Sequence, residues 1–193
     1  LFPQNFDLSE PMMAKAGATL PITLTPPLLA LIALALIVGA PFVIVNHVAA
    51  FGEEFGWRGY LLPKLMETMS APKAIVCNGA LWGLAHFPLT IFGHNYGLGS
   101  PLHPFLPILM MMLFATAMGT FLSYLTLKTD SVIPASIAHG ATNAVGGAAI
   151  FFVASGYVPL LGPNVAGLFG MSGFLILAVF LLIKLKQSDV TKH

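Results

Sequence analysis

The sequence predicts an all-α, polytopic membrane protein, and three observations lead to that fold class. Only 8% of the 193 residues are charged and 57% are hydrophobic, whereas a soluble domain carries about 25% charged residues. In lipid, only helices and closed barrels satisfy every backbone N–H and C=O group. The apolar runs are long and lack the period-two alternation that barrel strands show, so we expect helices.

Apolar segments near or above the roughly 20 residues that a span needs predict about five transmembrane helices. They are residues 26–62, 75–92, 105–127, 132–153 and 165–183. The first is too long for one perpendicular crossing, so we expect Pro41 to kink it or to end part of it. The chain thus divides into an N-terminal segment at 1–25, a helical membrane domain at 26–185 and a cytoplasmic tail at 186–193.

The basic residues predict the orientation of these helices. With five crossings, Lys64, Lys73, Lys128 and the lysines after the last span share one side, and the second and fourth connectors hold no Lys or Arg. Basic loops stay in the cytoplasm, so we expect a multi-pass protein of the cell membrane with a cytoplasmic C-terminus and lipid as a partner. The chain begins with Leu1, and we expect one or more N-terminal spans to be missing from it. A net charge of +1 gives no argument for nucleic acid.

Ionisable residues inside apolar runs are the candidates for function, because each costs several kcal/mol in mid-bilayer. Glu54 and Arg58 are four residues apart, so they meet on one helix face and are expected to form a structural ion pair. Glu53 is rotated by about 100° from Glu54 and can face a polar cavity, where its carboxylate would accept a proton. The alternative is that all three residues form one buried charge network that fixes the fold.

Two further segments carry histidines. His86 is alone in its span with Trp82 one turn earlier, a pattern that by itself is typical of a hydrogen-bonded packing residue. His139 and Asn143 are four residues apart, so one face presents an imidazole and a carboxamide, which suits binding an oxyanion, polarising a carbonyl or holding a metal. Counted inward from the span ends, Glu53, His86 and His139 lie deep enough to meet between the midplane and the cytoplasmic leaflet.

These motifs together resemble a known family. They read E-E-x-x-x-R at residues 53–58, aromatic-x-x-x-H at 82–86 and H-x-x-x-N at 139–143. In that order on separate spans, over about residues 40–150, they are similar to the CAAX prenyl protease and bacteriocin-processing (CPBP) family. Trp82 stands where the family more often has Phe.

The resemblance implies an intramembrane endopeptidase, related to the type II CAAX prenyl endopeptidase, that cleaves a membrane-associated or lipidated peptide or protein. It implies that Glu53 and His86 activate a water, and that His139 and Asn143 stabilise the oxyanion. Supporting roles beside these catalytic residues fall to Glu54, Arg58 and Trp82.

Metal dependence stays open at this stage. Glu53, His86 and His139 with a water could complete a three-ligand catalytic Zn²⁺ site. The chain lacks H-E-x-x-H, however, and a Glu–His pair can activate water without a metal, so we favour metal-free chemistry. His94 and His103, in the connector at 93–104, are interpreted as polar loop residues and not as a second metal site.

Two other function classes remain. A proton-coupled transporter also carries ionisable residues in its spans, but it would usually show inverted repeats and more spans. A non-catalytic immunity or partner-binding membrane protein of the same fold is the harder rival, because a complete motif set does not show that a substrate is cut.

Overall fold

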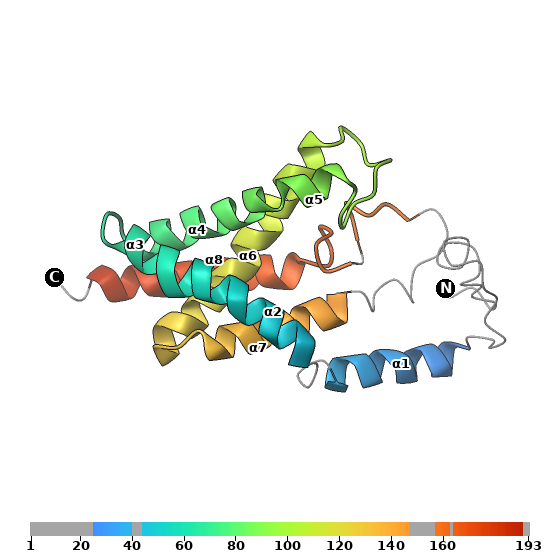
Figure 1. The fold of residues 1–193 in the computed structure, drawn as a ribbon, viewed down its shortest axis with the longest axis horizontal. Helices are drawn as coiled ribbons and strands as arrows, with labels where there is room; N and C mark the ends of the chain where they lie inside the picture. Colours follow the sequence, from blue (N-terminus) through green and yellow to red (C-terminus); the bar gives the residue numbers. More distant parts are fainter. Residues whose placement is uncertain (1–24, 40–43, 147–156, 163, 191–193) are drawn as a thin grey trace.

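The computed structural model describes residues 25–39, 44–146, 157–162 and 164–190, and these ranges contain helices, turns and no strand (Figure 1). The helical fold class is therefore confirmed. The helices are α1 (Pro26–Gly39), α2 (Ile44–Glu54), the π-helix η3 (Phe55–Leu61), α3 (Leu62–Met66), α4 (Ala71–Ala85), α5 (Phe87–Ile91), α6 (Phe105–Thr129), α7 (Ile133–Gly146) and α8 (Ser172–Val190).

The first predicted segment, at residues 26–62, is divided into more than one helix, as expected from its length. Helix α1 ends at Gly39 and α2 begins at Ile44, while Pro41 lies outside the described residues. From Ile44 the chain stays helical through α2, η3 and α3 to Met66, because Glu54 and Leu62 at the two ends of η3 keep right-handed helical dihedrals. The wider π turn is common at functional sites, and here it directly follows the two glutamates.

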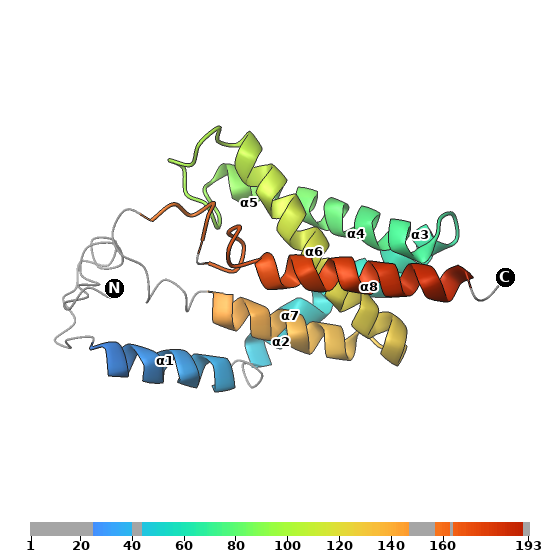
Figure 2. The same ribbon diagram turned by 180° about the vertical axis from the view of Figure 1, so that it is seen from behind.

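Helix α6 is the centre of the bundle and packs against α4, α7 and α8 (Figures 1 and 2). Its closest neighbour is α4, and glycines make that approach possible. A Cβ added at Gly79 would lie 2.6 Å from the Cα of Thr116, and one at Gly83 would collide with the Cα of Met112. The core around this crossing includes Trp82, Phe114, Met118 and Leu122.

Three predicted helices have other bounds in the structure. The segment predicted at 75–92 is divided at His86 into α4, which begins at Ala71, and the short α5. The segment predicted at 132–153 is helical from Ile133 to Gly146, and 147–156 lies outside the described residues. The segment predicted at 165–183 begins only at Ser172, so its start was wrong. Asn164 explains the difference, because its Oδ1 accepts the backbone N–H groups of Ala166 and Gly167 at 2.7 and 2.8 Å and so holds a turn in place of a helix.

One helix of the described residues, α6, is long and apolar enough to cross a membrane by length and composition. The other described helices do not meet both conditions, so the prediction of about five crossings stays a prediction.

The two ends of the bundle differ in charge. The α3–α4 connector, the α6–α7 connector and the end of α8 lie at one end, opposite the loop at 93–104 (Figures 1 and 2). At the first end, the ammonium groups of Lys128 and Lys184 lie 5.8 and 5.7 Å from the ring centroid of Tyr124. The exposed Lys64 of α3 bonds to Glu67 at the same end.

Candidate active site

A pocket of about 600 Å³ lies between α2, α4, α6 and α7. The four residues predicted as catalytic all line it: Glu53, His86, His139 and Asn143. They come from three separate segments, since Glu53 is in α2, His86 lies between α4 and α5, and the other two are in α7. The chain therefore brings together, in one cavity, residues that the sequence separates by up to 90 positions, 53 to 143.

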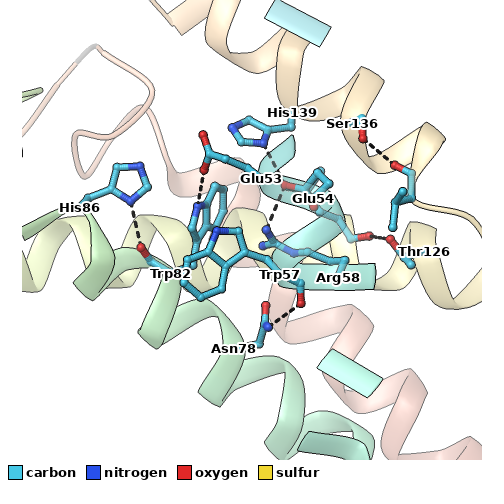
Figure 3. A network of polar contacts seen from close by, with 12 residues as sticks. Glu53, Glu54, Trp57, Arg58, Asn78, Trp82, His86, Thr126, Ser136 and His139 are labelled. Carbon is cyan, nitrogen blue, oxygen red and sulfur yellow. Dashed lines mark hydrogen bonds and ion pairs between the residues drawn. The ribbon is translucent and has the colours of Figure 1, made fainter. Parts of the chain in front are cut away.

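Glu53 is half-buried at the edge of this pocket. Its Oε2 accepts a hydrogen bond from the indole Nε1 of Trp82 at 2.9 Å (Figure 3). Trp82 is only 2% exposed, so the donor is fixed by core packing. A hydrogen bond to a carboxylate is stronger than one between neutral groups, and this one holds the carboxylate in a defined position at the cavity wall.

Trp82 also orients His86. The Nδ1 of His86 lies 2.9 Å from the backbone oxygen of Trp82 (Figure 3). A carbonyl oxygen only accepts, so Nδ1 must donate, and a neutral His86 then carries its lone pair on Nε2. The rings of Trp82 and His86 meet edge to face, with centroids 5.9 Å apart. One tryptophan therefore positions both members of the predicted water-activating pair.

Glu54 is fully buried and has two partners. Its Oε1 accepts from Nη1 of Arg58 at 3.0 Å, which confirms the predicted ion pair, and from Nδ1 of His139 at 2.9 Å (Figure 3). The second bond was not predicted, and it fixes the imidazole of His139, which is 4% exposed. Because Nδ1 donates to the carboxylate, a second N–H at Nε2 exists only on the imidazolium form.

Arg58 lies under the pocket, with 1% of its surface exposed. Its Cζ is 4.2 Å from the centroid of the Trp82 ring, and a Cβ at Gly119 would lie 2.5 Å from Nη2. Nε and Nη2 find no hydrogen-bond partner among the described residues. The Glu54 carboxylate and the aromatic face of Trp82 are therefore the main compensation for this buried cation.

Asn143 completes the predicted set. It follows His139 by one helical turn on α7 and has an exposed side chain that lines the pocket. An imidazole and a carboxamide thus border the same cavity as Glu53 and His86. Much of the remaining wall consists of apolar side chains, namely Leu89, Met111, Phe114, Met118 and Val165, and of polar ones, namely His94, Asn95, Thr142, Tyr157 and Asn164.

His94 is the pocket residue that sequence analysis assigned to a polar loop. It is in a loop, but its ring is stacked on that of His86, with centroids 6.4 Å apart and an angle of 19° between the planes. Helix α5 ends at Ile91, and the chain then turns back towards the pocket. Gly93 and Asn95 allow a turn here, but spacing alone could not have placed His94 beside His86.

The protein donors do not form a metal centre in the described residues, because no group of three or more His, Cys, Asp and Glu side chains lies close enough to hold an ion. Glu53, His86 and His139, the ligands expected for Zn²⁺ if it bound, line one pocket without forming such a group. The Nδ1 atoms of both histidines are already bonded within the protein, which leaves Nε2 as the ring nitrogen that could bind an ion. As these side chains lie in the described residues, they do not form a three-ligand zinc site, and a metalloprotease is not supported.

Comparison with known proteins agrees with the motifs. Residues 26–145 match the family model described as type II CAAX prenyl endopeptidase Rce1-like. A relative named CAAX prenyl protease 2, from Methanococcus maripaludis, is 33% identical over 111 residues, which are 53% of this chain and 38% of that protein. This chain thus spans well under half the length of that relative. No solved structure matches this chain. On the match of residues 26–145, the chain belongs to the Rce1-like family of type II CAAX prenyl endopeptidases.

Proposed function

We propose that this protein is an intramembrane endopeptidase that hydrolyses a peptide bond of a membrane-associated or lipidated peptide or protein. The observation that carries the proposal is the single pocket lined by a carboxylate, imidazoles and a carboxamide from three segments. Hydrolysis of an amide needs a base for the water, donors for the oxyanion and a proton for the leaving amine. The protease named among the relatives supports the same class of reaction.

Glu53 and His86 are the proposed water-activating pair. The carboxylate of Glu53 is held by Trp82, and the lone pair of His86 is on Nε2 when its ring is neutral. A water between them donates one hydrogen to each acceptor, which aims an oxygen lone pair at the substrate carbonyl. Glu53 takes the proton as the C–O bond forms and then delivers it to the amine as the C–N bond breaks.

Asn143 and His139 are the proposed oxyanion donors. The amide Nδ2 of Asn143 donates directly, and His139 donates from Nε2 in its imidazolium form. Glu54 has a positioning role in this scheme, because its carboxylate accepts from Nδ1 of His139 at 2.9 Å and so fixes the ring. Preorganised donors of this kind stabilise the transition state without reorganisation during the reaction.

The proposed setting is a membrane crossed several times, with lipid around the bundle and the C-terminus in the cytoplasm. Helix α6 meets the requirements of a span, and large apolar side chains such as Phe92, Phe105 and Ile176 are 70% or more exposed, at 83%, 73% and 74%. A water-facing surface would not retain so many. The end of the bundle that carries Lys64, Lys128 and Lys184 supports a cytoplasmic assignment for that end.

The test is cleavage of a membrane-anchored peptide library by purified protein, with and without a strong chelator, alongside measurement of bound zinc. We expect cleavage that resists the chelator, because the proposed scheme draws on side chains alone. Abolition by the chelator and recovery with added Zn²⁺ would contradict that scheme. Absence of cleavage in both arms, from protein shown to be folded, would favour the non-catalytic partner-binding function.

A further inference from the structure

The loop between α5 and α6 contributes a side chain to the pocket that the three motifs do not include. The imidazole of His94 lies beside that of His86 and nearly parallel to it, with ring centroids 6.4 Å apart and an interplanar angle of 19°. These values fall in the range of an offset stack. His94 is eight residues after His86 and comes from a different local structure, because α5 lies between them.

The backbone on both sides of His94 is set by the loop. Gly93 and Asn95 have positive φ angles of 88° and 65°, a conformation that glycine and asparagine adopt most readily. The backbone N–H of His94 donates to the oxygen of Leu89 at 3.1 Å. The chain therefore reverses sharply around His94 and directs its ring back towards the end of α4.

A second connector holds this loop in place. Nδ2 of Asn164 donates to the backbone oxygen of Asn95 at 3.0 Å, and the hydroxyl of Tyr96 donates to the backbone oxygen of Ala166 at 3.0 Å. We call these four residues the latch. Tyr96 is 1% exposed, so the latch is anchored in the core, close to His94.

The ring of His86 needs support on the side where His94 lies. Its Nδ1 bonds to Trp82 on one side, but it lies where α4 ends and its ring borders an open cavity. Burial, and the neighbouring His86, lower the pKa of His94 from its ordinary value, which favours the neutral form of the His94 ring. The other titratable side chains of the pocket wall are Glu53, His139 and Tyr157.

We propose that His94, fixed by the latch, is a positioning residue for His86: its ring lies beside the imidazole, nearly parallel to it, and keeps Nε2 directed at the water. The proposal rests on the proposed function for its catalytic consequence. The property of His94 that matters is its flat ring, since it is the ring that lies beside His86.

Substitutions of His94 separate this role from others. We expect His94→Ala to lower kcat about three- to tenfold, the value of one aromatic contact, with KM nearly unchanged. His94→Phe keeps a flat ring and should restore most of the loss. Asn164→Ala, which breaks the latch without touching either ring, should lower kcat in the same direction. Thermal unfolding in detergent identifies variants that are folded.

A second readout does not depend on cleavage. Carbethoxylation of His86 by diethyl pyrocarbonate, followed by mass spectrometry of the full chain, reports access to its ring. We expect faster modification of His86 in His94→Ala and in Asn164→Ala, and the wild-type rate in His94→Phe. If wild-type protein cleaves no substrate, the proposed function fails, while the modification rates still decide the positioning role.

Two results would overturn the inference. One is a His94→Ala protein with wild-type kcat and an unchanged modification rate of His86. The other is a His94→Phe protein that is impaired as strongly as His94→Ala, which would assign the effect to the ring nitrogens and not to the flat ring.

Discussion

Glu53 and Glu54 are neighbours in the sequence, yet the structure gives them opposite environments. Glu54 is fully buried and its Oε1 is shared by Arg58 and His139 at 3.0 and 2.9 Å. Glu53 is half-buried, borders the pocket and accepts from the indole of Trp82. The comparison teaches that a step of one residue along a helix is enough to separate a carboxylate that holds the fold from one that is available for chemistry.

Trp82 forms the boundary between these two regions. Its ring lies over the guanidinium of Arg58 on the buried side, while its Nε1 and its backbone oxygen bind Glu53 and His86 on the pocket side. The following predictions test whether the two regions are as distinct as their contacts indicate.

The largest expected effect on stability is that of Glu54→Gln. Removing this carboxylate leaves Arg58 as a buried cation without an ionic partner, which costs about 3–5 kcal/mol. Denaturation in detergent should show a matching fall in the free energy of unfolding. Glu67→Gln is the control, because it breaks the exposed pair with Lys64 at 2.7 Å and should cost no more than about 1 kcal/mol. Equal losses in the two variants would contradict the structural role of Glu54.

On the pocket side, His86→Gln should lower the cleavage rate about 10²- to 10⁴-fold, the usual contribution of a group that moves or orients a proton. Since His86 is half-buried, we expect the folded yield to stay near that of the wild type. His103→Gln is the matched control, because His103 is in the loop between α5 and α6 and does not line the pocket. A similar loss of activity in both variants would remove the special role of His86.

The next largest effect on catalysis is expected from the loss of one oxyanion donor. Asn143→Ala is expected to lower kcat about 10²- to 10³-fold with little change in KM, as measured by steady-state kinetics. Thr142→Ala is a neighbouring control, because its hydroxyl donates within its own helix, to the oxygen of Ala138 at 2.8 Å. If Asn143→Ala changes KM and leaves kcat intact, the side chain binds the ground state and not the oxyanion.

The smallest expected effect is that of Trp82→Phe. Phenylalanine retains an aromatic ring over Arg58 but cannot donate to Glu53, so the variant removes one hydrogen bond to a carboxylate, worth about 1.5 kcal/mol at the low end of its range. We expect kcat to fall about tenfold and the fold to persist. An unchanged kcat would mean that Glu53 is positioned without the indole.

Much of the helical architecture could be predicted because composition and apolar run length determine it. The runs at 105–127 and 132–153 correctly place the starts of α6 and α7, whereas the run at 75–92 is divided at His86 into α4 and α5. The start of α8 could not be predicted, because the side chain of Asn164 satisfies backbone N–H groups that a helix would otherwise use. The π turn of η3 was also not predicted.

Part of the candidate site could likewise be predicted from the sequence, and part of it could not. Within the motifs, residues 54 and 58, 82 and 86, and 139 and 143 are each four apart and so share a helix face, and the motifs could be found in the sequence. The bond from His139 to Glu54 joins residues 85 positions apart, and the stack of His94 on His86 depends on a loop held by Asn164. Contacts of this kind arise from tertiary packing and leave no periodic signal in the chain.

The most direct test of the account compares Glu53→Gln with Glu54→Gln in one preparation, measuring cleavage per folded molecule and folded yield together. The account predicts that Glu53→Gln folds like the wild type and loses about 10²- to 10⁴-fold in cleavage, whereas Glu54→Gln loses folded yield first. A Glu53→Gln protein that is folded and cleaves the same peptide at the wild-type rate would contradict the central claim that Glu53 is the catalytic base.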